Sequence, residues 1–222
     1  MTLWLVFLPV IVVALMAWVV VSSSRWVVDT RISMRSDLAV APGAQPDVDD
    51  YLRLGFSLVG SCDVTTNGHD TIFSYLLSGD RRTYAVATDQ VRCLTSSFGE
   101  RVMVSISHAA TPIPPLELRQ LVVAQGLDEL VAAHEAALAV LANHGRQPDP
   151  MRPERVVPFS MEIDRISMDY ILTHKIAFGF AMLGKMLNLP PRNAAAIRPD
   201  KRTASRIDRW AVSPRPPAKT SL

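Results

Sequence analysis

The sequence predicts an α+β protein: an N-terminal transmembrane helix, then a small antiparallel β-sheet of about five or six strands in a meander, packed with two helices. Three observations carry this prediction. An uncharged apolar run fills residues 3–22, apolar and polar residues alternate in short runs between residues 56 and 107, and helical spacing begins after residue 126. We expect four parts: an anchor (1–26), a tether (27–48), the α+β domain (49–189) and a disordered, basic, Pro-rich tail (190–222).

Composition agrees with one folded domain plus appendages. Of the 222 residues, 49% are apolar, which is enough to build a core. The net charge of +2 points to no charged partner by itself. The charge is uneven, however, because the last 33 residues hold eight Lys and Arg against two Asp.

The first apolar run is long enough to cross a bilayer. About 20 uncharged residues in a helix extend about 30 Å, the thickness of a hydrocarbon core. Trp4 and Trp26 bracket the run, as expected of indole rings at the headgroup level. A cleaved signal peptide is the alternative, but it requires a basic N-terminal region and a shorter apolar segment. We therefore expect an anchor that is retained.

Basic residues set the expected orientation of this anchor. None precedes the run, whereas Arg25, Arg31 and Arg35 follow it closely. Because positive residues stay on the cytoplasmic side, we expect the N-terminus outside the cell membrane and the domain in the cytoplasm. Trp4, Arg25 and Trp26 are then the membrane-interface residues.

Period-two patterns predict the sheet. In "FSLVGSCDV", one face would hold Phe56, Leu58, Gly60, Cys62 and Val64, which indicates a half-buried strand. A tight turn at Asn67-Gly68 follows. Further strands are predicted over 71–78, 83–88, 91–98 and 101–107, and we favour a strand over 116–124. Short turns between successive strands favour a meander.

Apolar residues at helical spacing predict the helices. A first helical turn is expected near Asp47, ahead of the first strand. The best helix runs from residue 127 to Gly145, with one stripe of Leu127, Leu130, Val131, His134, Leu138 and Leu141. A long helix is predicted from Ser160 to Leu189.

The second half of that long helix is apolar almost all round. It is too short for a second span, at about 14 residues. Either it is buried on the sheet or in an oligomer, or it rests on the bilayer as an interfacial helix. The candidate partner or membrane surface consists of Ile176, Phe178, Phe180, Met182, Lys185 and Met186.

Segments such as "YLRLGFSLVGSCDV", "TYAVATDQVRCLTSSFGERVMVSI" and "LDELVAAHEAAL" carry a family resemblance. Over residues 50–145 the chain resembles a loose set of uncharacterised bacterial membrane-anchored proteins with an "LGF…G" small α+β domain. The resemblance implies a small antiparallel sheet, a following helix and an N-terminal anchor. It implies no activity and no catalytic residue.

Searches for reactive motifs find none that is complete. "HEAAL" begins like a zinc helix, but Leu138 stands where the second ligand belongs, so we expect a structural His134. Cys62 and Cys93 are expected on inward faces of strands that are not neighbours, as reduced core thiols. No cofactor and no metal site is expected.

The basic tail has three interpretations: a solvated end, a contact with anionic lipid, or a contact with nucleic acid. Of the two contacts, lipid is favoured because the tail belongs to a membrane-anchored chain. The candidate lipid contacts are Arg192, Arg198, Lys201, Arg202, Arg206 and Arg209.

Two functions remain open. The first is a non-enzymatic accessory or scaffold protein that joins the bilayer to a protein partner or to a second copy of itself. The second is a membrane-tethered enzyme whose site is assembled from scattered residues such as Asp63, His69 and His108.

Overall fold

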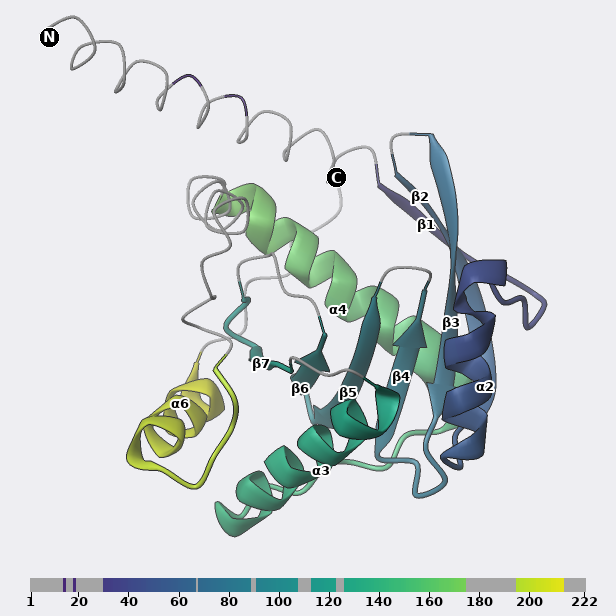
Figure 1. The fold of residues 1–222 in the computed structure, drawn as a ribbon. Helices are drawn as coiled ribbons and strands as arrows, with labels where there is room; N and C mark the ends of the chain where they lie inside the picture. Colours follow the sequence, from purple (N-terminus) through teal and green to yellow (C-terminus); the bar gives the residue numbers. More distant parts are fainter. Residues whose placement is uncertain are drawn as a thin grey trace, which may run out of the picture.

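The structure, a computed structural model, describes residues 30–66, 68–88, 91–107, 113–122, 126–174 and 195–213, together with Ala14 and Trp18. These residues form one seven-stranded sheet with helices on both faces (Figure 1). The strands are β1 (Arg31–Met34), β2 (Ser57–Thr66), β3 (His69–Leu77), β4 (Thr83–Ala87), β5 (Arg92–Phe98), β6 (Arg101–Ile106) and β7 (Glu117–Leu121). The helices are η1 (Pro42–Ala44), α2 (Gln45–Arg53), α3 (Leu127–Asn143), α4 (Pro153–Thr173) and α6 (Lys201–Val212).

The strands follow one another in the sheet in chain order. Each neighbouring pair from β1 to β6 is antiparallel, and the short turns predict this for the pairs from β2 to β6. β7 pairs in parallel with β6, so the sheet is mixed and not a pure meander. Because the two strands run in the same direction, β7 begins at the same end of the sheet as β6.

The two faces of the sheet are covered by different helices. On one face, α2 and α3 pack on β3, β4 and β5 through residues such as Tyr51, Leu76 and Leu130. Next to them, α6 packs on α3, β6 and β7. On the other face, α4 packs on β2, β3, β4 and β6, and it passes behind the strands in Figure 1. The result is a three-layer domain with an apolar layer on each side of the sheet.

A β-bulge in β2 changes which residues share a face. The register with β3 shifts between Leu58 and Gly60. As a consequence, Leu58 packs under α2 and α3, whereas Cys62 packs on the opposite face under α4. The prediction of a single apolar face from Phe56 to Val64 is therefore wrong, because an extra residue at a bulge inverts the alternation beyond it.

Gly60 lies at this bulge, where α4 approaches the strand closely. A Cβ atom at Gly60 would lie 2.5 Å from Cγ2 of the buried Val157. Only glycine leaves room for the helix at this distance. The absence of a side chain here thus sets how closely α4 packs on β2.

Two predicted boundaries move in the structure. Residues 31–34 belong to the predicted tether but form the edge strand β1, whose register pairs Ile32 with Val64. α4 begins at Pro153, seven residues before the expected cap at Ser160, and Ser160 is buried inside the helix. The end of α3 is as predicted, with Gly145 at φ 71° just beyond it. In place of the two expected helices, α2, α3, α4 and α6 all pack on the sheet.

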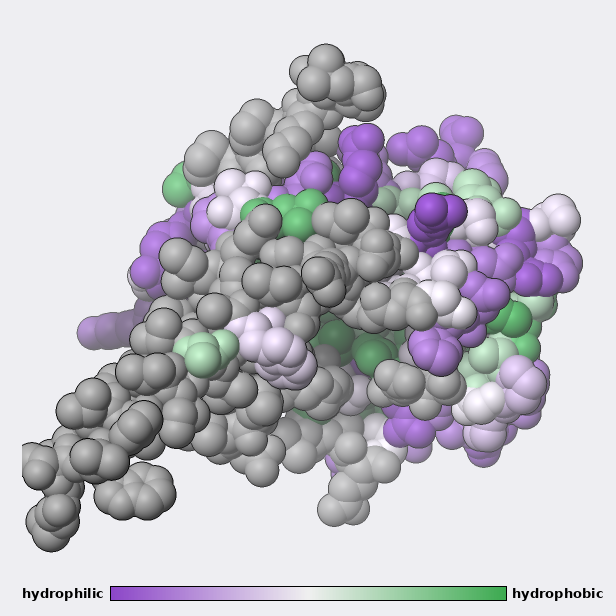
Figure 2. All heavy atoms as spheres, turned by 90° about the horizontal axis from the view of Figure 1, so that it is seen from above, coloured by the Kyte–Doolittle hydropathy of each residue, from purple (hydrophilic) through white to green (hydrophobic). Residues whose placement is uncertain are grey.

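The outer surface of the described residues is mainly polar in one view. Seen from above, hydrophilic side chains cover most of the coloured surface, and hydrophobic ones lie between them in small groups (Figure 2). This distribution fits a domain whose large apolar side chains are mostly buried between the helices and the sheet.

Tyr51 offers a test of the packing between α2 and the sheet. Among the buried side-chain nitrogen and oxygen atoms of the described residues, its hydroxyl alone has no hydrogen-bond partner. The ring packs on Phe56 with centroids 5.2 Å apart. Tyr51→Phe keeps this packing and removes an unsatisfied group, so we expect the free energy of unfolding to rise by about 1 kcal/mol.

Urea denaturation of the full chain in detergent micelles measures this change. Tyr84→Phe is the matched control, because the hydroxyl of Tyr84 is hydrogen-bonded to Ser160 and Thr95. The control should lower the free energy of unfolding by about 1 kcal/mol. A loss of stability in Tyr51→Phe would contradict the described environment of this hydroxyl.

Candidate functional site

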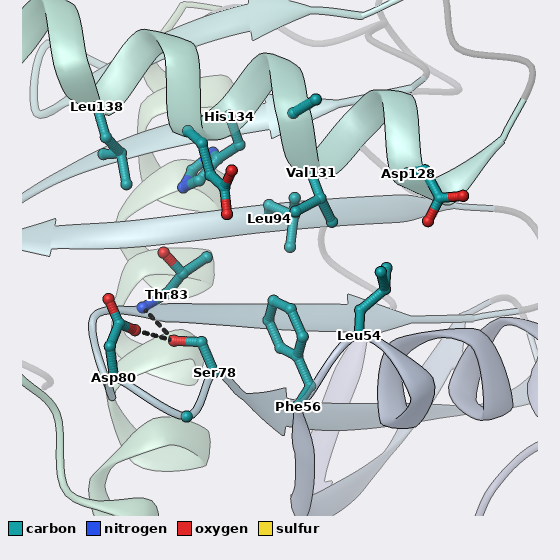
Figure 3. Close-up of a pocket in the computed structure, with 13 residues that line it drawn as sticks. Leu54, Phe56, Ser78, Asp80, Thr83, Leu94, Asp128, Val131, His134 and Leu138 are labelled. Atoms are coloured by element: carbon teal, nitrogen blue, oxygen red, sulfur yellow. Dashed lines mark hydrogen bonds between the residues drawn. The ribbon is translucent and has the colours of Figure 1, made fainter.

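A pocket of about 460 Å³ lies between α3 and the strand ends next to α2. In Figure 3, Asp128, Val131 and Leu138 point from α3 toward a wall formed by Leu54 and Phe56 and by the turn that holds Ser78 and Asp80. Leu54 and Phe56 come from the "LGF" segment that joins α2 to β2. The volume is in the range of sites that bind small ligands or anchor side chains of a partner.

The pocket has apolar walls and an acidic rim. Its apolar lining comes from Leu54, Phe56, Leu94, Val131 and Leu138. Leu54 is 40% exposed, so part of this apolar lining is accessible from outside the domain. Asp80, Asp128 and Glu135 are exposed and line the same pocket. The site therefore offers an apolar floor with negative charge around it.

The turn on the far wall is held in place by its own hydrogen bonds. Ser78 Oγ donates to Asp80 Oδ1 at 2.6 Å and accepts from the backbone N–H of Thr83 at 3.0 Å, as the dashed lines of Figure 3 show. The same carboxylate oxygen accepts from the N–H of Arg82 at 3.1 Å. Asp80 is thus presented at a fixed position on the rim.

Beneath the pocket, His134 joins α3 to the sheet through a chain of buried hydrogen bonds. Its Nε2 lies 2.9 Å from Ser96 Oγ on β5, and its Nδ1 lies 2.8 Å from Ser105 Oγ on β6. Ser96 Oγ continues to Thr83 Oγ1 on β4 at 2.8 Å. Gln120 Nε2 on β7 donates to Ser105 Oγ at 2.7 Å. Four strands and one helix are connected by this network.

One donor in this network is fixed by its chemistry. The amide Nε2 of Gln120 can only donate, so Ser105 Oγ accepts from it, and the same amide group also donates to the carbonyl oxygen of Ala133 at 3.0 Å. Both ring nitrogens of His134 have a hydroxyl partner, so either neutral tautomer has both of its ring nitrogens hydrogen-bonded.

The network leaves His134 neutral and poorly suited to proton transfer. Burial lowers the pKa of His134 to about 3, because removing the ring from water disfavours its charged form. A base of such low pKa is inefficient near pH 7. The expectation of a structural His134 agrees with this geometry, and its side chain is more deeply buried than the stripe on α3 suggests.

The cysteines lie where the strand pattern predicts. Cys62 on β2 and Cys93 on β5 are both free thiols, and both pack on the α4 face of the sheet. Two strands separate them, which rules out a bridge within the domain. Burial raises the pKa of both thiols, that of Cys93 to about 12, so neither is a ready nucleophile.

The residues named for an enzymatic site do not come together where the structure describes them. Asp63 Oδ1 accepts from Arg35 Nη1 at 2.7 Å, in an ion pair between β2 and the end of β1. His69 is exposed at the start of β3, and His108 lies outside the described residues. The pocket under α3 is lined by neither Asp63 nor His69. Within the described part of the chain, no group of three or more His, Cys, Asp or Glu is placed to hold a metal ion.

A second polar cluster lies between α4 and the sheet. Glu117 and Arg119, two residues apart on β7, form a buried ion pair in which Arg119 Nη2 donates to Glu117 Oε2 at 2.8 Å. Asp164 on α4 stands near them. Burial raises the pKa of Asp164 to about 7, and the negative charge of Glu117 adds to this shift. This carboxyl group therefore titrates near neutral pH.

The predicted tail differs most from its expectation. Residues 201–212 form α6, with Asp200 as its cap accepting from the N–H of Thr203 at 2.7 Å. Ile207 and Trp210 are buried against α3, β6 and β7. This described part of the tail is therefore folded, because two large apolar side chains on one helix face repay the cost of ordering it.

Other predicted site residues lie outside the described residues. They include Trp4, Arg25 and Trp26 of the anchor, the apolar set Ile176, Phe178, Phe180, Met182, Lys185 and Met186, and Arg192 of the tail. In the part of the chain that the structure describes, no helix combines the length and apolarity needed to cross a bilayer. The anchor stays a prediction from the sequence.

Comparisons with protein-family models, with curated proteins and with solved structures find no match to this chain. The fold defines the class as a mixed-sheet α+β domain, and the site must be interpreted from its own chemistry.

Sequence reasoning missed the pocket because its residues carry no common spacing. Asp80, Asp128 and Glu135 come from a turn and from two places on α3. One signal was available, namely the "LGF" segment, which supplies two lining residues. The acidic rim was visible only as ordinary surface charge.

Proposed function

We propose that this chain is a non-enzymatic accessory protein, anchored in the cell membrane by its N-terminal run, whose α+β domain binds a protein partner in the pocket under α3. One observation carries the proposal: the pocket joins an apolar floor to a rim of exposed carboxylates. The polar groups beneath it, from Thr83 to Gln120, already bond to one another and hold the fold.

The chemistry of the pocket defines the partner segment. Leu54, Val131 and Leu138 favour an apolar anchor side chain. Asp80, Asp128 and Glu135 favour Lys or Arg on either side of it. We therefore propose a short partner segment in which an apolar residue is flanked by basic ones. The carboxylates of the rim would repel an acidic segment, and the apolar floor would disfavour a uniformly polar one.

Two alanines on α3 provide a matched test. Ala132 and Ala136 are both exposed and stand one turn apart, but only Ala132 lines the pocket. Full-length chains carrying a photo-crosslinking amino acid at either position are expressed in their native membrane and irradiated. We expect a discrete crosslinked partner from position 132 and none from position 136, with the linked peptide apolar and basic.

Charge reversal on the rim separates this contact from chance capture. Asp128→Lys with Glu135→Lys should lower the crosslink yield from position 132 about three- to tenfold, because rim charges steer association. Glu129→Lys, exposed on α3 but outside the pocket lining, should leave the yield within about twofold. Equal yields from positions 132 and 136, an acidic partner peptide, or no response to reversal would refute the proposal.

A further inference from the structure

A second cavity, of about 300 Å³, lies at the β7 edge of the sheet and is lined by arginines of one helix face. Arg202, Arg206 and Arg209 stand on α6 at spacings of four and three residues, so their side chains project on the same side. The opposite wall comes from Pro114 and Pro115 in the segment before β7.

The central arginine is held in a fixed position at this edge. Arg206 is half-buried, and its Nη1 and Nη2 donate to the carbonyl oxygens of Ala195 and Arg119, each at 2.8 Å. These bonds tie α6 to a carbonyl of the edge strand β7. The guanidinium group is therefore preorganised and loses little freedom if a ligand reaches it.

Positive charge is in excess around the cavity. Arg202 and Arg209 are exposed on either side of Arg206, and their charges join burial in lowering the pKa of Arg206. Glu117 is the acidic residue of the lining, and it is engaged by Arg119 in the buried ion pair described above. The carboxylate of Asp200 lies close enough to act on Arg206 but caps the start of α6.

The remaining walls limit the kind of anion that fits. Leu118 and Trp210 line the cavity beside the arginines, and the indole N–H of Trp210 is occupied by the carbonyl of Leu116 at 2.9 Å. A tetrahedral oxyanion can accept from several guanidinium groups at once, while an apolar substituent on it would lie against the proline and tryptophan side.

We propose that this cavity binds a phosphate group, supplied either by a soluble phosphate or by the headgroup of an anionic lipid. The same chemistry serves both sources, because the arginines recognise the oxyanion and the cavity is open to either. A disordered basic tail could contact a membrane through any of its charges. Phosphate binding in this cavity instead requires a folded α6 and the particular arginines Arg202 and Arg209. It is independent of the pocket under α3.

The test uses the full-length chain in nanodiscs of neutral lipid, with hydrogen–deuterium exchange of α6 as the measurement. Inorganic phosphate at millimolar concentration should slow exchange in α6, whereas chloride at equal ionic strength should not. Arg202→Gln with Arg209→Gln should weaken the response to phosphate at least about tenfold, because two charge-assisted contacts are lost.

The matched control removes the same charge outside the cavity. Arg198→Gln with Lys201→Gln alters two exposed basic residues that do not line it, and the response should stay within about twofold of the parent chain. A parallel set of nanodiscs contains phosphatidic acid and no added phosphate. Slow exchange in these nanodiscs assigns the lipid headgroup as the source, and a response to soluble phosphate alone assigns the free anion.

Three results would overturn the proposal. One is equal loss of response in the cavity variant and in the control variant, which would indicate a diffuse charge effect. Another is the absence of any response to phosphate and to phosphatidic acid. The third is a response to a single-stranded oligonucleotide alone, which would assign the surface to nucleic acid. Circular dichroism confirms that the variants are folded before exchange is compared.

Discussion

Asp164→Asn is expected to stabilise the protein at pH 8 by about 2 kcal/mol and to have no effect at pH 4. In the folded chain the pKa of Asp164 is about 7, and in the unfolded chain it returns to its usual value near 4. Between these values the folded state binds more protons, so the stability of the parent chain falls as the pH rises. Asp164 is partly exposed, which keeps the effect below the full shift.

His134 acts in the opposite direction over much of the same range. Its pKa is about 3 in the folded chain, well below the usual value near 6.5. As the pH falls from about 6.5, the unfolded state takes up a proton that the folded state refuses, and stability is lost. The two groups offset each other between about pH 4 and 6.5. Removing Asp164 should therefore expose a steeper rise in stability with pH.

Urea denaturation at several pH values from 4 to 8 measures both effects in the full chain. Asp169→Asn is the control, since it also removes one carboxylate from α4. The difference between Asp164→Asn and the parent chain should grow with pH and level off near pH 8. A difference independent of pH would mean that Asp164 ionises as an ordinary surface carboxylate.

Trp210→Ala should lower the free energy of unfolding by about 3–5 kcal/mol. Trp210 is 5% exposed, and its ring meets Phe98 edge-on with centroids 5.4 Å apart. Its indole N–H donates to the carbonyl of Leu116 at 2.9 Å, and Arg101 donates to its backbone carbonyl. The substitution removes the packing and one of two hydrogen bonds to the Leu116 carbonyl, which also accepts from the N–H of Val102 at 3.1 Å.

A local measurement shows whether the loss arises at α6. Limited trypsin digestion should cut at the arginines of α6 faster in Trp210→Ala than in the parent chain, because the helix is released from β7. Val212→Ala is the control, since Val212 is 80% exposed on the same helix. A loss below about 1 kcal/mol with unchanged cleavage would mean that this helix contributes little to the fold.

The sheet could be predicted where local patterns were sufficient. Alternation in 71–77 and 92–98 marked β3 and β5, and the helical stripe around His134 marked α3. These patterns report that one face of an element is buried. They do not report which layer covers that face. Cys62 could thus be placed on an inward face, but the inversion at Gly60 could not be foreseen.

The candidate sites were less predictable than the fold. The basic residues of the tail were counted correctly, yet their arrangement depends on α6 packing at the β7 edge. A composition rich in Pro, Arg and Ala favoured disorder for this segment. Ile207 and Trp210 outweigh that composition because a preformed apolar surface of α3, β6 and β7 receives them.

By itself, the sequence determined the order of the antiparallel strands from β2 to β6, the position of α3 and the separation of the two thiols, because each depends on neighbours along the chain. The tertiary structure alone decided the parallel pairing of β7, the side of the sheet that each strand shows to α4, and the two cavities. These features join residues from Leu54 to Leu138 and from Ile113 to Trp210. Contacts across such separations form only when the layers pack, and no local spacing records them.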